Sequence, residues 1–90
     1  MSQLLLAQKL KNRFSNDKVC YLRNIIINGD KRGCSGFITS NDKTVYVNTE
    51  VLGGGYLYRI AKDNKDYQGG VNQYAKNIDT LVNGINALLK

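Results

Sequence analysis

The side chains that carry most acid–base and metal chemistry are nearly missing from this chain. It contains no histidine, its one glutamate is Glu50, and its two cysteines are Cys20 and Cys34. General acid–base catalysis and nucleophilic triads usually depend on histidine. A structural zinc site needs four ligands, which two cysteines without histidine cannot supply. The composition therefore predicts a binding protein rather than an enzyme, with no catalytic residue, no metal site and no cofactor.

The positive charge of the chain is concentrated in its first 40 residues. Thirteen lysines and arginines stand against seven acidic residues, which gives a net charge of +6. Seven of the basic residues but only two of the acidic ones lie within residues 1–40. Such a concentration is typical of proteins that contact phosphate backbones, and the alternative is a solvated helix face followed by a basic turn. The predicted phosphate-binding residues, which would contact nucleic acid, are Lys9, Lys11, Arg13, Lys31 and Arg32.

Tyrosine supplies a second kind of binding chemistry, with six residues in the chain. Tyr46, Tyr56 and Tyr58 fall on strand-like segments. Together on an open sheet face they would form a platform for stacked bases or an anchor for a protein partner. The alternative is that some of them pack against helices, because one sequence does not fix the register of a sheet.

Two glycine clusters interrupt the second half of the chain. Gly53, Gly54 and Gly55 predict a flexible turn, since the lysine and the following helix of a phosphate-binding P-loop are missing. Gly69 and Gly70 lie in a polar segment flanked by tyrosines and amides. That segment is either a binding loop or a loop that folds back to shield the sheet edge.

The elements that must position these residues follow from hydrophobic periodicity. Apolar residues recur at helical spacing in residues 2–15 and in residues 77–90, where Asn77 is the expected N-cap. Strand-like composition between turn signals predicts strands, and the polar stretch 62–76 predicts a long loop. The predicted strands cover residues 19–27, 33–39, 44–51 and 56–61.

These elements predict one α+β domain spanning residues 1–90. Short strands joined by tight turns favour a four-stranded antiparallel sheet. Both terminal helices are amphipathic, so we expect them to pack on one face of the sheet and to leave the other face to solvent or to a partner. An exposed strand edge could also pair with a second copy, which would give a homodimer.

One motif in the second half of the chain resembles a known group of domains. Arg59, Ala61 and Lys62 form an Arg-x-Ala-Lys segment, and residues 66–72 read Asp-Tyr-x-Gly-Gly-x-Asn. This arrangement resembles small domains of phages and other mobile elements of low-GC bacteria, including the large polyvalent protein-associated domains. The resemblance implies an accessory protein that engages a host nuclease or nucleoprotein complex. With the aromatic residues, it suggests a partner-binding set of Tyr46, Tyr56, Tyr58, Arg59, Tyr67 and Tyr74.

Two functions are therefore expected. The first is a non-enzymatic phage or mobile-element protein that engages a host nucleic-acid enzyme and inhibits a defence nuclease, as anti-CRISPR proteins do. Its positive charge disfavours acidic DNA mimicry. The alternative is a protein that binds DNA or RNA directly through a basic face and tyrosine stacking.

The compartment is expected to be the cytoplasm of a bacterial host. No apolar run approaches the roughly 20 residues of a membrane span. Residues 1–7 lack the pattern of a secretory signal, because no charge precedes the short apolar run and charged residues follow it closely. In a reducing cytoplasm Cys20 and Cys34 would remain thiols, and buried structural thiols are favoured over a disulfide or a functional pair.

Overall fold

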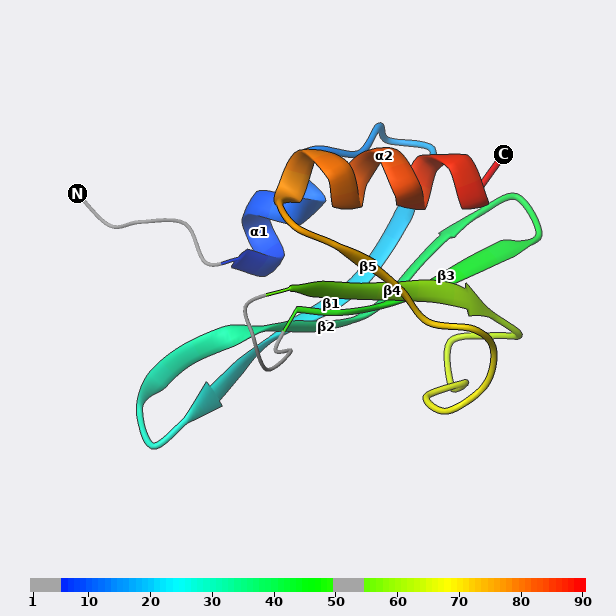
Figure 1. Ribbon diagram of the computed structural model, residues 1–90. Coiled ribbons are helices and arrows are strands. Elements are labelled where there is room, and N and C mark those ends of the chain that lie inside the picture. Colours follow the sequence, from blue (N-terminus) through cyan, green and yellow to red (C-terminus); the bar gives the residue numbers. More distant parts are fainter. Residues whose placement is uncertain (1–5, 50–54) are drawn as a thin grey trace.

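The chain folds into one antiparallel sheet covered on one face by two helices. The computed structural model describes residues 6–49 and 55–90, except for the side chain of Lys31. Both helices lie on the same side of the sheet (Figure 1), as the amphipathic patterns predicted. The elements are α1 (Leu6–Lys11), β1 (Val19–Ile27), β2 (Asp30–Ser40), β3 (Lys43–Asn48), β4 (Tyr56–Ala61), β5 (Gln73–Ala75) and α2 (Ile78–Leu88).

Tight turns explain why neighbouring strands of the sheet follow chain order, β1-β2-β3-β4-β5. Asn28 and Gly29 connect β1 to β2 with φ angles of 52° and 84°. Positive φ at both central residues is the geometry that matches the twist of a two-residue hairpin. Asn41, with a φ of 57°, makes the next turn between β2 and β3. Asparagine tolerates this conformation better than most residues.

The core lies between the helices and one face of the sheet. Residues of β3 alternate between the two faces of the sheet, and Val45 and Val47 are fully buried on the helix side. Asn77 caps α2 as predicted, because its side-chain oxygen accepts a hydrogen bond of 2.8 Å from the backbone N–H of Thr80. The other core residues with no exposed surface are Leu10, Cys34, Ile38, Leu81 and Ile85.

The sheet has five strands instead of the predicted four. Residues 73–75 show no alternating apolar pattern, and they become β5 only because Ala75 pairs with Tyr56 and Gln73 with Tyr58. The first helix is also shorter than predicted. The α-helix ends at Lys11, and the backbone N–H of Phe14 then bonds to the Lys11 carbonyl oxygen at 3.2 Å in a tighter turn. Ser2, the start of the predicted helix, lies outside the described residues.

Gly84 in α2 makes room for a tyrosine of the sheet. A Cβ atom at this position would overlap the Tyr58 ring and its hydroxyl group. The Tyr58 side chain is 7% exposed and belongs to the core. The glycine therefore allows α2 to approach β4 closely.

We expect Gly84→Ala to lower the free energy of unfolding by about 1–3 kcal/mol, as overpacking usually does. In an exposed helix the same change would instead stabilise by about 1 kcal/mol. The measurement is urea unfolding followed by circular dichroism, with Asn83→Ala at the neighbouring exposed position as the control. A stabilised Gly84→Ala variant would contradict the contact.

Candidate binding site on the open sheet face

A row of large side chains crosses the sheet face that the helices leave open. Tyr21 pairs with Phe37, Phe37 with Tyr46, and Tyr46 with Arg59. Directly paired residues of an antiparallel sheet point to the same face. The row therefore runs from β1 through β2 and β3 to β4.

The loop after β4 folds over part of this row and adds a further ring. Tyr67 packs edge-on against Phe37 and Tyr46, with ring centroids 5.1 Å and 6.0 Å away. The rings of Phe37 and Tyr46 lie 5.4 Å apart and tilted. Such arrangements are preferred by aromatic pairs. They explain why Phe37 is only 2% exposed although no helix covers it.

Arg59 fixes the loop to the sheet. Its side chain is 2% exposed, and its guanidinium carbon lies 4.7 Å from the Tyr46 ring centroid. One terminal nitrogen donates a hydrogen bond of 2.8 Å to the carbonyl oxygen of Asp66. The other lies 3.6 Å from the Asp66 carboxylate and donates to the Ile60 carbonyl oxygen at 3.3 Å. The buried charge is therefore paired, hydrogen-bonded and placed against an aromatic ring.

Asp66 organises the loop from its other side. Its carboxylate accepts hydrogen bonds of 2.9 Å from the backbone N–H groups of Lys62 and Gly69. The bond from Lys62, the bond from Gly69 and the Arg59 charge together hold the pKa of Asp66 below its ordinary value. The next glycine, Gly70, continues the loop with a φ of 79°. This segment is a loop folded back onto the sheet.

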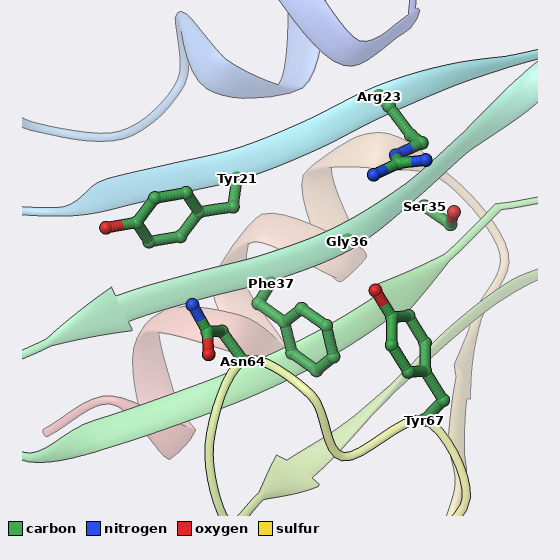
Figure 2. A pocket seen from close by; sticks show the side chains of 7 residues that line it. All are labelled: Tyr21, Arg23, Ser35, Gly36, Phe37, Asn64 and Tyr67. Atoms are coloured by element: carbon green, nitrogen blue, oxygen red, sulfur yellow. The ribbon is translucent and has the colours of Figure 1, made fainter.

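A pocket of about 400 Å³ remains where the loop faces β1 and β2. Figure 2 shows Phe37 between Tyr21 and Tyr67, and the Tyr67 side chain rises from the loop with its hydroxyl directed toward Ser35 and Arg23. The three rings supply apolar walls, and a guanidinium, a hydroxyl and an amide supply polar groups. The lining residues are Tyr21, Arg23, Ser35, Gly36, Phe37, Asn64 and Tyr67.

Arg23 is the one charged residue of the pocket lining. It is exposed, and within residues 6–49 and 55–90 no acidic side chain forms an ion pair with it. Its guanidinium can therefore meet an anion from solvent. Planar rings beside an available guanidinium suit a ligand that is both aromatic and anionic.

Gly36 allows the two strands of the pocket to approach each other. A Cβ atom there would overlap the Tyr21 carbonyl oxygen and the Leu22 backbone, and its φ is 151°. Substitution at Gly36 would therefore strain the backbone and separate β1 from β2.

None of the predicted phosphate-binding residues is among those that line this pocket. Lys9 and Lys11 are exposed on α1, in the helix layer. Arg13 forms an ion pair of 2.8 Å with Asp79 near the start of α2. Arg32 is exposed beside the β1–β2 turn, and the neighbouring Lys31 has its side chain outside the described part of the structure. Lys9, Lys11 and Arg13 therefore lie in the helix layer or just after α1, whereas Arg32 lies in the β1–β2 hairpin.

The structure shows the second alternative for two of the three platform tyrosines, which pack on the helix side of the sheet. Tyr58 pairs with Val47, so both face the helices, and Tyr56 packs against the core from the same side of β4. Only Tyr46 of the three lies on the open face. In β4 it is Arg59, and not Tyr56 or Tyr58, that faces the same side of the sheet as Tyr46.

The other predicted partner-binding residues are also placed apart. Tyr67 lines the pocket, whereas Arg59 is buried under the loop and supports it. Tyr74 is 63% exposed on β5, at the far edge of the sheet from β1. Sequence reasoning missed Tyr21 and Arg23, although their alternation along one strand was a usable signal. The remaining missed residues are Ser35, Gly36, Phe37 and Asn64.

The structure shows the expected free thiols. Cys34 is fully buried and Cys20 half-buried, and they are not joined by a disulfide. Burial raises the pKa of both thiols, so they are poor nucleophiles. Among the described residues no cluster of three or more cysteine or acidic side chains could hold a metal ion. None of the helices described is long and apolar enough to cross a membrane.

Comparison of the chain with protein-family models, with curated proteins and with solved structures gives no match.

We expect the Asp66→Asn variant to lose less of its free energy of unfolding than wild type when the pH is lowered. Because folding lowers the pKa of Asp66 below 3.8, its contribution is present above that pH and is lost as the pH falls through the folded-state pKa. The measurement is the urea midpoint at about pH 7 and about pH 3. Wild type and the control Asp63→Asn, in the same loop, should lose more stability on acidification than Asp66→Asn. Equal losses in all three would argue against the role of this carboxylate.

Proposed function

We propose that this protein binds single-stranded nucleic acid on the open face of its sheet and catalyses no reaction. The observation that carries the proposal is the pocket, which combines three aromatic rings with the available guanidinium of Arg23. Proteins bind single strands by stacking bases on aromatic side chains and placing cations on the backbone. In this assignment a base stacks on Tyr21 or Tyr67, and Arg23 contacts a phosphate.

The exposure of the rings supports stacking. Tyr21 and Tyr67 are 55% and 57% exposed, so ring surface remains accessible after they pack against their neighbours. Ser35 and Asn64 add donors and acceptors that can meet the edge of a base. The volume of about 400 Å³ lies in the range of small-ligand pockets and suits a single base with its sugar.

The charge distribution supports an anionic partner as well. No acidic residue lines the pocket, and the net charge of the chain is +6. Lys9 and Lys11 lie on the opposite side from the pocket, so they would steer association rather than contact the bound strand. Their contribution should therefore be weaker than that of Arg23.

A mobile-element setting remains a proposal that rests on the resemblance in residues 59–72. The structure gives Arg59 and Asp66 a supporting role, since they hold the loop that carries Asn64 and Tyr67. A domain that binds single strands could engage a host nucleoprotein complex through an exposed guide or target strand. In that setting it would act in the cytoplasm of a bacterial cell.

We expect Arg23→Gln to weaken binding of oligonucleotides of about 12 nucleotides and to reduce the slope of log K against log salt by about one. Lys9→Gln is the matched control, because it removes the same charge from the helix side. Tyr21→Ser should cost about 1–3 kcal/mol, or roughly 5- to 100-fold in affinity. The measurement is fluorescence anisotropy with labelled single-stranded DNA and RNA.

Two results would overturn the proposal. One is the absence of binding to every oligonucleotide at low salt by a correctly folded wild-type protein. The other is an equal loss of affinity in Lys9→Gln and Arg23→Gln, which would show that charge alone matters and that the pocket is not the site. Circular dichroism of each variant confirms that the fold is retained.

A further inference from the structure

The two edges of the sheet differ in how they are protected. β5 has three residues and is followed by the exposed Lys76, both features that discourage edge-to-edge pairing. β1 has nine residues, no proline and a single charge, at Arg23. It pairs with β2 on one side, and no strand of the described residues pairs with its outer side. A register shift interrupts its pairing with β2 between Ile25 and Ile26. A long edge with a single charge is otherwise a template for another strand.

β1 also carries an unusual share of the exposed apolar surface. Eight large hydrophobic residues are exposed in the described parts of the chain, and four of them lie on this strand. The four are Val19, Tyr21, Ile26 and Ile27, at 47%, 55%, 57% and 45% exposure. Exposed apolar residues gathered on one element are typical of an interaction surface.

The order of residues along β1 favours an identical strand as the partner. On the open face the strand reads Val19, Tyr21, Arg23, Ile25, Ile27, with apolar residues on both sides of one central charge. When two such strands pair antiparallel about Arg23, Val19 lies opposite Ile27 and Tyr21 lies opposite Ile25. Val19 and Ile27 are both exposed and then meet across the interface, and the exposed Tyr21 meets the half-buried Ile25. Apolar cross-strand pairs of this type stabilise sheets.

We propose that β1 pairs antiparallel with β1 of a second copy of this chain, joining the two sheets edge to edge. The pairing covers the exposed apolar residues and satisfies the outer backbone groups of both strands. A two-fold axis through Arg23 makes the contact self-complementary, as in most homodimers.

The dimer would also change the binding site, and this step rests on the proposed function. Tyr21 and Arg23 lie on β1, so the two pockets would adjoin on one continuous sheet face. The two Arg23 guanidinium groups would lie near the axis and repel each other. A bound polyanion would relieve that repulsion, and an oligonucleotide should therefore tighten the dimer.

The experiment is sedimentation velocity over protein concentrations from about 1 μM to about 1 mM. Wild type should reach twice the 10.1 kDa mass of one chain. Ile27→Lys should raise the dimer dissociation constant at least about tenfold, because it places a charge at the interface. Ile60→Lys is the matched control, since Ile60 has a similar exposure of 47% but lies on the interior strand β4.

A charge exchange tests the register. Val19→Lys and Ile27→Glu should each weaken the dimer, and the double variant should recover most of the loss, because Lys and Glu would then face each other across the axis. Positions 19 and 27 lie at opposite ends of one strand, so this recovery needs a second copy.

Three results would overturn the inference. The first is a wild type that remains a monomer at every concentration, with or without oligonucleotide. The second is an equal dimer dissociation constant for Ile27→Lys and Ile60→Lys. The third is a double variant whose dimer dissociates more readily than that of either single variant. Anisotropy with the same proteins keeps the two proposals apart. A dimer that binds no oligonucleotide supports the pairing and refutes the proposed function.

Discussion

The buried guanidinium of Arg59 is the constraint on which the open face depends. A charge that leaves water must be paired and hydrogen-bonded, or its burial costs several kcal/mol. Here the carboxylate and carbonyl of Asp66, the Ile60 carbonyl and the Tyr46 ring together meet that requirement. Asp66 can contact the Arg59 guanidinium only when the loop folds back over the sheet. The position of Tyr67, the next residue, and hence one wall of the pocket follows from this pairing.

The same constraint divides the open face into two parts. Over β3 and β4 the loop buries the row of side chains, as the 2% exposure of Arg59 shows. Over β1 and β2 the face stays accessible, and the pocket forms at the boundary between the two parts. Both proposals, binding and pairing, therefore concern β1, which carries one accessible ring, an available cation and an edge that no strand of the described residues pairs with.

The sequence predicted the elements whose signals are local. Periodicity identified β1, β4 and the buried face of α2, and Asn77 marked the start of that helix. The sequence could not predict β5, because residues 73–75 form a strand only by pairing with β4. The sequence also could not predict the register between neighbouring strands, and this register determines on which face of the sheet Tyr58 lies. Arg59 was expected to bind a partner, and its burial could not be predicted, because Asp66 lies seven positions away along the chain and meets it only when the loop folds back.

Gly36 limits how this pocket can change during evolution. Its backbone lies against Tyr21 and Leu22 so closely that any side chain there would disturb the β1–β2 ladder. A substitution at Gly36, which lines the pocket, would therefore destabilise the fold. Selection for a new ligand is not expected to change this position. Ser35 and Asn64 line the same pocket without that constraint. Related proteins that bind different ligands are expected to differ at Ser35 and Asn64 and to keep glycine at position 36.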